Sequence, residues 1–182
     1  MQALTTAQYT ALITAIRKGG KGFRPNPRVA AALTIEGNLG LRIGDVLRLK
    51  MSDIVRGTTG YRLNIIEQKT GKKRRFSVPD EVYSFLRDYC TTYGIGDDEQ
   101  MFPITVRMVQ SHLKKVCEVL GYTNVSTHSF RKWCATDIYN ATHDIVLVQH
   151  LLQHSSAAIT QRYIGIDDEK VNQAIGKHAL IA

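Results

Sequence analysis

The sequence has few of the residues that build disulfide-bonded or metal-stapled proteins, with 3 cysteines, 4 prolines and 1 tryptophan in 182 residues. Cys90, Cys117 and Cys134 lie far apart and form no Cys-x-x-Cys pair, so we expect buried free thiols in a reducing compartment and no metal site. No apolar run approaches membrane-spanning length, and no signal peptide is visible. These absences predict a soluble, cytoplasmic protein without membrane association.

Acidic residues are also scarce relative to basic ones. There are 16 Asp and Glu against 24 Lys and Arg, which gives a net charge of +8 and a sequence pI of about 9.5. This balance favours an acidic partner, most simply a nucleic acid backbone, although a modest positive charge can also serve solubility alone. With 43% hydrophobic residues, the chain has the size and composition of one globular domain.

Apolar periodicity predicts a mainly α-helical domain with one small antiparallel β-sheet, an α+β fold. Period-two alternation occurs only at 61–65 and again at Phe76 and Val78, around a turn at Thr70-Gly71. Helical spacing accounts for most of the rest: a helix after Thr5 that ends at Gly19, a buried helix over 29–41, a short helix after Arg42, a helix capped by Asp80, one over 105–120, several between Ser126 and Gly165, and an amphipathic one over 167–180.

Six residues whose side chains suit phosphate chemistry stand in order along the chain: Arg42, Lys69, His128, Arg131, His154 and Tyr163. A guanidinium fork fits the oxygens of a phosphate, an imidazole transfers protons near neutral pH, and an activated phenol is a nucleophile. Taken singly, each has an ordinary interpretation as a helix surface, a solvated hairpin or a half-buried aromatic. Their combination points to a reaction at phosphorus.

In this order and spacing, the six residues resemble the signature of the tyrosine recombinase, or phage-type integrase, family. That signature is a Gly-Leu-Arg motif, a β-hairpin lysine, His-x-x-Arg, a Leu-Gly-His box and a tyrosine nine residues beyond its histidine; here His154 precedes Tyr163 by nine. The resemblance covers essentially the whole chain. It implies the catalytic-domain fold of a prokaryotic or phage recombinase, which cuts and rejoins DNA through a 3′-phosphotyrosine without metal, ATP or another cofactor.

The resemblance assigns the proton and bond-making steps. Tyr163 would attack a DNA phosphorus, and His128 would help to take the phenolic proton. Lys69 would protonate the leaving 5′ oxygen as general acid, with Lys72 and Lys73 as weaker candidates. The hairpin is two residues longer on its return strand than is usual in the family.

The resemblance also assigns the groups that hold the phosphate. Arg42 and Arg131 would bind its non-bridging oxygens, His154 would add a third hydrogen bond, and Asp45 would support Arg42. Gln153 replaces the usual glycine of the Leu-Gly-His box, a change that a helical backbone would accommodate.

Further basic residues are candidates for DNA contacts, from the hairpin or from the helix over 105–120: Lys72, Lys73, Arg74, Arg75, Arg107, Lys114 and Lys115. The interpretation as a solvated face stays open for them. The remaining histidines, His112, His143, His150 and His178, are expected at the surface or in packing.

Most members of the family carry a helical core-binding domain before the catalytic domain, and residues 1–182 are expected to be the catalytic domain alone. The chain is then either truncated or similar to the minimal, single-domain recombinases. The segment 167–180 resembles the helix that family members dock onto a neighbouring protomer, although it can also pack on its own domain. Partners expected are a double-stranded recombination site, further protomers and accessory DNA-bending proteins.

Integration, excision and inversion of mobile DNA all fit the leading hypothesis. A type IB topoisomerase, which uses similar residues, is a second one. A non-catalytic DNA-binding regulator of another recombinase is a third, and the intact set of six residues argues against it.

Overall fold

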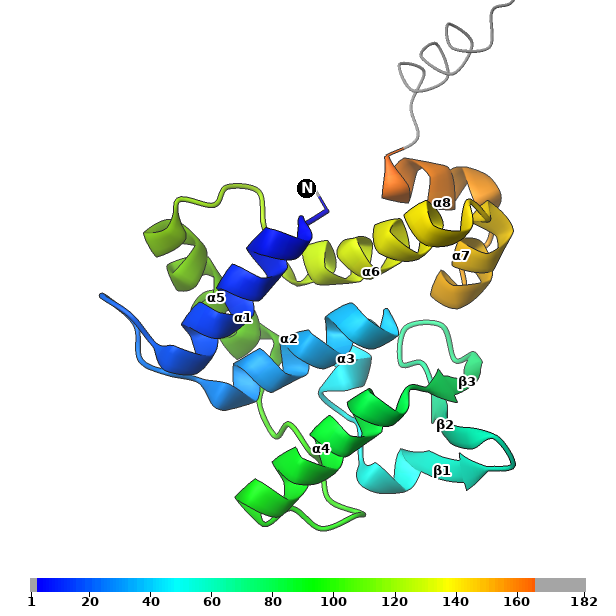
Figure 1. The fold of residues 1–182 in the computed structure, drawn as a ribbon, viewed down its shortest axis with the longest axis horizontal. Helices are drawn as coiled ribbons and strands as arrows, with labels where there is room; N and C mark the ends of the chain where they lie inside the picture. The colour runs from blue at the N-terminus through cyan, green and yellow to red at the C-terminus, as the bar shows by residue number, and fades with distance from the viewer. Residues whose placement is uncertain (1–2, 166–182) are drawn as a thin grey trace, which may run out of the picture.

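The structure is a computed structural model that describes residues 3–165, and it is mainly helical with one three-stranded sheet (Figure 1). The expected α+β class is confirmed. The elements in chain order are α1 (Thr6–Lys18), α2 (Pro27–Leu39), α3 (Ile43–Val46), the 3₁₀ helix η1 (Met51–Asp53), β1 (Ile54–Gly57), β2 (Gly60–Ile66), β3 (Lys73–Val78), α4 (Asp80–Tyr93), α5 (Val106–Leu120), α6 (Thr127–Thr142), α7 (Ile145–Leu152) and α8 (Ala157–Ile164). The segment 167–180 lies outside the described residues.

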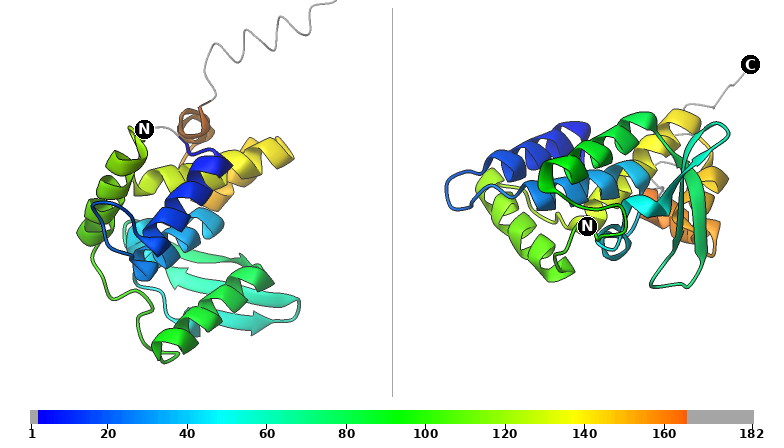
Figure 2. Two further views of the ribbon diagram at one scale, coloured as in Figure 1. Left: turned by 60° about the vertical axis from the view of Figure 1, so that its left-hand side comes forward. Right: turned by 90° about the horizontal axis from the view of Figure 1, so that it is seen from below.

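The sheet is antiparallel in the order β1-β2-β3. The expected hairpin is confirmed, with Leu63 opposite Phe76. β1 was not predicted, because four residues are too few to show an alternation. Tyr61 of β2 stacks on Tyr83 of α4 with ring centroids 3.5 Å apart, and Figure 2 shows α4 lying across the sheet. One face of the hairpin is therefore packed against a helix, and the other is left to solvent.

Local capping chemistry sets most helix ends. Thr5 and Gln8 form the expected capping box at the start of α1. At α4 the expectation is wrong in detail, because Pro79 is the N-cap and Asp80 is the first helical residue. An aspartate there still favours the helix start, since its charge interacts with the positive end of the helix dipole.

α2 is the central helix and packs against both α1 and α6. Its Gly37 permits the contact, because an added Cβ would meet the rings of Tyr9 and Trp133 at 3.0 and 3.3 Å. These two rings stack with centroids 4.0 Å apart. All three cysteines are buried and free, as expected.

A second, smaller apolar cluster joins the C-terminal part of α6 to α7 and α8. Its buried members are Ala135, Val148, Leu152 and Ile164. Figure 1 shows α7 and α8 together at one end of α6, away from α1 and α5. The last two described helices therefore depend on a cluster much smaller than the main core.

Within residues 3–165, no helix combines the length and the apolar character that crossing a membrane requires.

The turn after α2 gives a test of this packing. Gly40 is left-handed, with φ 57°, and an added Cβ would lie 3.2 Å from Cys134 Sγ. Gly71 is equally left-handed, with φ 66°, but an added Cβ would have no atom within 4 Å. We expect Gly71→Ala to lower the free energy of unfolding by ~1 kcal/mol, from backbone strain alone. Gly40→Ala should cost a further ~1–3 kcal/mol, because the site is also overpacked.

Urea denaturation of the two variants measures the difference. Equal losses would mean that the contact between Gly40 and Cys134 does not constrain the turn.

Candidate active site

Arg42 owes its position to the turn that ends α2. Gly40 closes the helix in the left-handed conformation, and Arg42 becomes the N-cap of α3 in an extended conformation. Its side chain is 20% exposed and forms an ion pair with the carboxylate of Glu67. The guanidinium is thus held from behind and remains partly open to solvent.

Glu67 is completely buried and binds two arginines at once. One carboxylate oxygen accepts from Arg42 and from the hydroxyl of Thr70 at 2.9 Å, and the other accepts from Arg74 Nη1 at 2.9 Å. Burial would raise the pKa of Glu67, but the hydrogen bonds from Thr70, Arg74 and Arg42 outweigh it and hold the pKa below its usual value. The carboxylate therefore stays charged between the two guanidinium groups.

The prediction that Arg74 contacts DNA is contradicted by its burial. Its side chain is 2% exposed and points into the protein, where Glu67 binds it. A guanidinium enclosed in this way does not offer a surface contact to a phosphate. Arg74 instead fixes the hairpin to the protein interior.

Asp45 is also corrected. It was expected to support Arg42, but the carboxylate that pairs with Arg42 is that of Glu67. Asp45 is 5% exposed, and its Oδ1 accepts from the backbone N–H of Gln68 at 2.9 Å. Asp45 thus holds the start of the loop that carries Lys69.

Arg131 lies in the first turns of α6 and is 2% exposed. Its Nη2 donates to the main-chain carbonyl of Leu152, the last residue of α7, at 2.9 Å. Its Nη1 is buried and has no hydrogen-bond partner among residues 3–165. Burial lowers the pKa of this guanidinium to about 10, so it is still charged at neutral pH. Arg131 therefore has one guanidinium nitrogen, Nη2, bound to the protein, and another, Nη1, with its donors available to a ligand.

The turn after α7 places His154. Gln153 adopts the left-handed conformation, with φ 54°, and not the helical backbone that would accommodate the change from glycine. The backbone N–H of His154 donates to the carbonyl of Gln149 at 3.1 Å, which closes the helix end. The side chain of Gln153 donates from Nε2 to the carbonyl of Lys73 at 3.2 Å, and Figure 1 shows the β2–β3 loop close to α7.

Tyr163 lies on α8 beside these groups. Its ring is edge-on to that of His154, with centroids 5.2 Å apart, and Lys132 Nζ lies 5.2 Å from its centroid. Its hydroxyl contacts the main-chain carbonyl of His128 at 3.5 Å. Burial raises the pKa of Tyr163 to about 12, although the charge of Arg131 lowers it. The phenol is therefore protonated at neutral pH and needs a proton acceptor to react.

Both histidines of the site have lowered pKa values. Burial, with the charges of Arg131 and Arg42, lowers the pKa of His154 to about 4. Partial burial and the charges of Arg131, Arg42 and Lys69 lower the pKa of His128, whose ring remains accessible to solvent. Both imidazoles are therefore neutral at pH 7. Because Arg131 and Arg42 affect the pKa of both histidines, and Lys69 affects that of His128, the side chains of these residues lie near one another.

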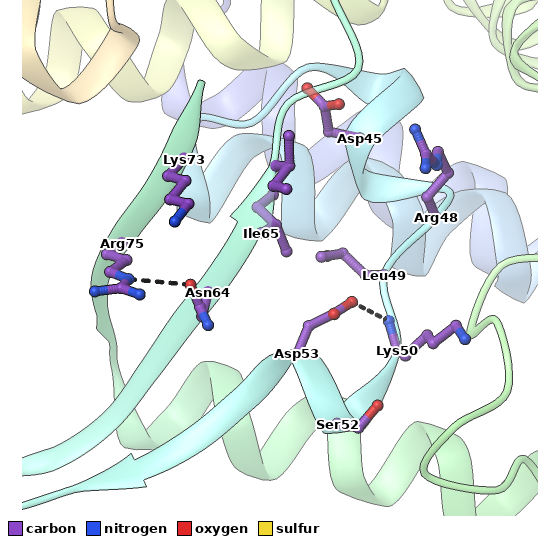
Figure 3. Close-up of a pocket in the computed structure, with 11 residues that line it drawn as sticks. Asp45, Arg48, Leu49, Lys50, Ser52, Asp53, Asn64, Ile65, Lys73 and Arg75 are labelled. Carbon is purple, nitrogen blue, oxygen red and sulfur yellow. Dashed lines mark hydrogen bonds between the residues drawn. The ribbon is translucent and has the colours of Figure 1, made fainter. Parts of the chain in front are cut away.

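Lys69 is exposed on the loop that joins β2 to β3. Lys72, Lys73 and Arg75 are exposed as well. Lys73 and Arg75 line a pocket of about 550 Å³ between the hairpin and residues 45–53, and Figure 3 shows both on β3. The hairpin thus offers a basic surface beside the site, without Arg74.

Three of the basic residues predicted to contact DNA lie elsewhere, on α5. Arg107, Lys114 and Lys115 are exposed on that helix. Nζ of Lys114 lies 3.9 Å from Oε1 of Glu118. Their contact with DNA stays a prediction. His112 packs edge-on against Phe23, as expected of a packing histidine.

Sequence reasoning missed several residues that shape the site: Glu67, Thr160 and Lys132. A signal for Glu67 was available, because the alternation that turns Leu63 inward also turns residue 67 inward. No such signal exists for Lys132 or Thr160, whose partners come from other elements. Among residues 3–165, no three His, Cys, Asp or Glu side chains group closely enough to hold a metal ion.

Comparison with known proteins places these observations in a family. The model of the phage integrase family matches residues 2–170. A probable integrase/recombinase, YoeC of Bacillus subtilis (strain 168), is 32% identical over 148 residues, which cover 75% of this chain and 77% of YoeC. The tyrosine recombinase XerC of Bradyrhizobium diazoefficiens is 29% identical over 153 residues, 79% of this chain but 47% of XerC. The chain thus spans about half the length of XerC.

Two solved structures share the fold. The XerH site-specific recombinase bound to a palindromic difH substrate aligns with a TM-score of 0.71 at 19% identity, over 96% of this chain and 52% of that one. The catalytic domain of bacteriophage HP1 integrase aligns with a TM-score of 0.67 at 18% identity, over 99% and 96%.

The buried carboxylate of Glu67 can be tested directly. Glu67→Gln should lower the free energy of unfolding by ~3 kcal/mol, because it removes the carboxylate that forms the ion pair with the buried Arg74. The matched control is Asp97→Asn in the surface pair Arg87–Asp97, whose side chains are 41% and 58% exposed. That change should cost less than ~1 kcal/mol. If urea denaturation gives similar small losses for both, Glu67 does not organise the site.

Proposed function

The chain belongs to the phage integrase family of tyrosine recombinases, and from this premise we propose that it is a site-specific recombinase that cuts and rejoins DNA through a 3′-phosphotyrosine intermediate. One observation carries the proposal: the phenol of Tyr163 lies beside Arg131, His154 and the main chain of His128. Residues 1–182 would form the catalytic domain, used to integrate, excise or invert mobile DNA.

The phosphate would bind between the two arginines. Arg42 is partly exposed while its position is fixed by Glu67. The unpartnered Nη1 of Arg131 would donate to a non-bridging oxygen, and His154 would add another hydrogen bond. Donors fixed in advance by the protein stabilise the charge that develops on the pentacoordinate phosphorus, without reorganisation during the reaction.

The chemical step would then be balanced by two proton transfers. Tyr163 Oη attacks the phosphorus while its proton passes to the neutral imidazole of His128. The bond to the 5′ oxygen breaks, and Lys69 supplies the proton that this oxygen needs. Attack by a 5′-hydroxyl on the phosphotyrosine reverses the step, so rejoining would conserve the bond energy and need neither ATP nor a metal.

Contacts to duplex DNA would come from the exposed cations of the hairpin, Lys72, Lys73 and Arg75, and from α5. Recombination needs more than one protomer on the DNA, and the segment 167–180 would dock between protomers. Accessory DNA-bending proteins would be further partners of such an assembly. The assembly would act in the cytoplasm.

The nucleophile is tested with DNA that traps the intermediate. We expect the protein to form a covalent adduct, stable in SDS, with a pool of duplexes of randomised sequence, each nicked near its centre so that the short cleaved fragment diffuses away. Mass spectrometry of the digested adduct should place the nucleotide on Tyr163. The matched Tyr163→Phe variant should form no adduct and bind the pool as the parent does.

An adduct at another residue, or none, would overturn the proposal. Relaxation of supercoiled plasmid without any recombined product would instead favour topoisomerase activity.

The general acid is tested on the DNA sequence recovered from the adduct. Lys69→Ala should slow cleavage of ordinary DNA by ~100-fold or more, because the 5′ oxygen leaves unprotonated. A substrate with sulfur in place of that oxygen has a leaving group that needs no proton, so it should restore the parent rate. Lys72→Ala and Lys73→Ala are the controls: they should bind DNA more weakly but, with the DNA saturated by protein, cleave both substrates at nearly the parent rate. If sulfur instead rescues one of the controls, Lys69 is not the acid.

A further inference from the structure

Thr160 contacts a residue of the site but has no part in the phosphate binding or proton transfers proposed above. It lies on α8, three residues before Tyr163, and is completely buried. Its hydroxyl oxygen lies 3.0 Å from Nδ1 of His154. A buried hydroxyl needs a hydrogen-bond partner, and for Thr160 that partner is the imidazole of His154.

The other hydrogen bonds of His154 involve its main chain. Its N–H donates to the carbonyl of Gln149, and its own carbonyl accepts from Gln149 Nε2 at 3.2 Å. These bonds fix the backbone, while the orientation of the ring depends on Thr160 and on the edge-on contact with Tyr163.

The neutral ring of His154 carries its proton on one nitrogen only, and the choice matters for binding a phosphate. Phosphate oxygens only accept hydrogen bonds, so the ring nitrogen that faces them must be the protonated one. Because Nδ1 faces Thr160, Nε2 is the nitrogen left for the phosphate. A protonated Nδ1 would turn a lone pair on Nε2 toward the anion.

We propose that Thr160 is a positioning residue: it donates its hydroxyl hydrogen to Nδ1 of His154, which keeps the proton on Nε2 and the ring aimed at the scissile phosphate. The proposal rests on the proposed recombinase function for its catalytic consequence, but not for the tautomer itself. Since Thr160 and Tyr163 share α8, the same helix would place both the nucleophile and the imidazole that binds the phosphate. In metal sites, too, a partner on the second ring nitrogen fixes the tautomer and orientation of a histidine, although there the imidazole is the donor.

The experiment compares Thr160→Val, which keeps the shape and removes the hydroxyl, with Thr160→Ser, which keeps the hydroxyl. The readout is the ¹⁵N NMR spectrum of the histidine-labelled protein at pH 7, with the His154 signals assigned by His154→Gln. In the parent and in Thr160→Ser, we expect Nε2 to carry the proton and Nδ1 to carry none. In Thr160→Val, the two nitrogens should shift toward a mixture of tautomers.

The rate of adduct formation on nicked DNA is the second readout. Thr160→Val should be slower by ~10-fold, with DNA binding unchanged, and Thr160→Ser should recover most of the loss. Thermal unfolding of both variants shows whether the fold is intact. If Thr160→Val does not fold, the tautomer of the parent and the rate of adduct formation of Thr160→Ser still test the proposal.

A proton on Nδ1 in the parent would overturn the proposal, as would an unchanged tautomer in Thr160→Val. A serine variant as slow as the valine variant would also overturn it. If the parent forms no adduct at all, the recombinase function fails, while the NMR spectra still determine whether Thr160 sets the tautomer.

Discussion

The site depends on a single buried carboxylate. Glu67 binds Arg42, the N-cap of α3, and Arg74 on β3, so it joins the start of α3 to the hairpin. A buried charge is tolerated only when it is paired, and here each member needs the others. The pairing fixes Arg42 with part of its guanidinium open to solvent. It also explains why one cation of a basic hairpin is turned into the protein.

A second junction lies at the C-terminal end of α7. Arg131 binds the carbonyl of Leu152, the left-handed Gln153 reaches the carbonyl of Lys73, and His154 follows at once. Groups from α6, from the hairpin and from the turn therefore meet at residues 152–154. A non-glycine residue with positive φ carries strain. The hydrogen bond from Gln153 to the hairpin offsets part of that strain.

Tyr163 lies on the more weakly anchored side of the molecule. α7 and α8 pack through the small cluster around Val148 and Leu152 rather than through the main core. Few buried apolar contacts mean a low cost for local rearrangement. The helix that carries the proposed nucleophile could therefore adjust if a phosphate bound to Nη1 of Arg131, while Arg42 is held fixed by Glu67.

The sequence by itself determined the fold class and most helix ends, because periodicity and capping are local properties, and it predicted the six residues of the site from their order and spacing. The same periodicity already predicts that Glu67 and Arg74 face inward on the hairpin. Arg74 was nevertheless predicted to contact DNA, because it stands within the basic run 72–75. Only the tertiary structure decided which carboxylate pairs with Arg42, what conformation Gln153 adopts and what faces Nδ1 of His154. Each depends on a partner from another element: 25 residues separate Arg42 from Glu67, and 80 separate Lys73 from Gln153.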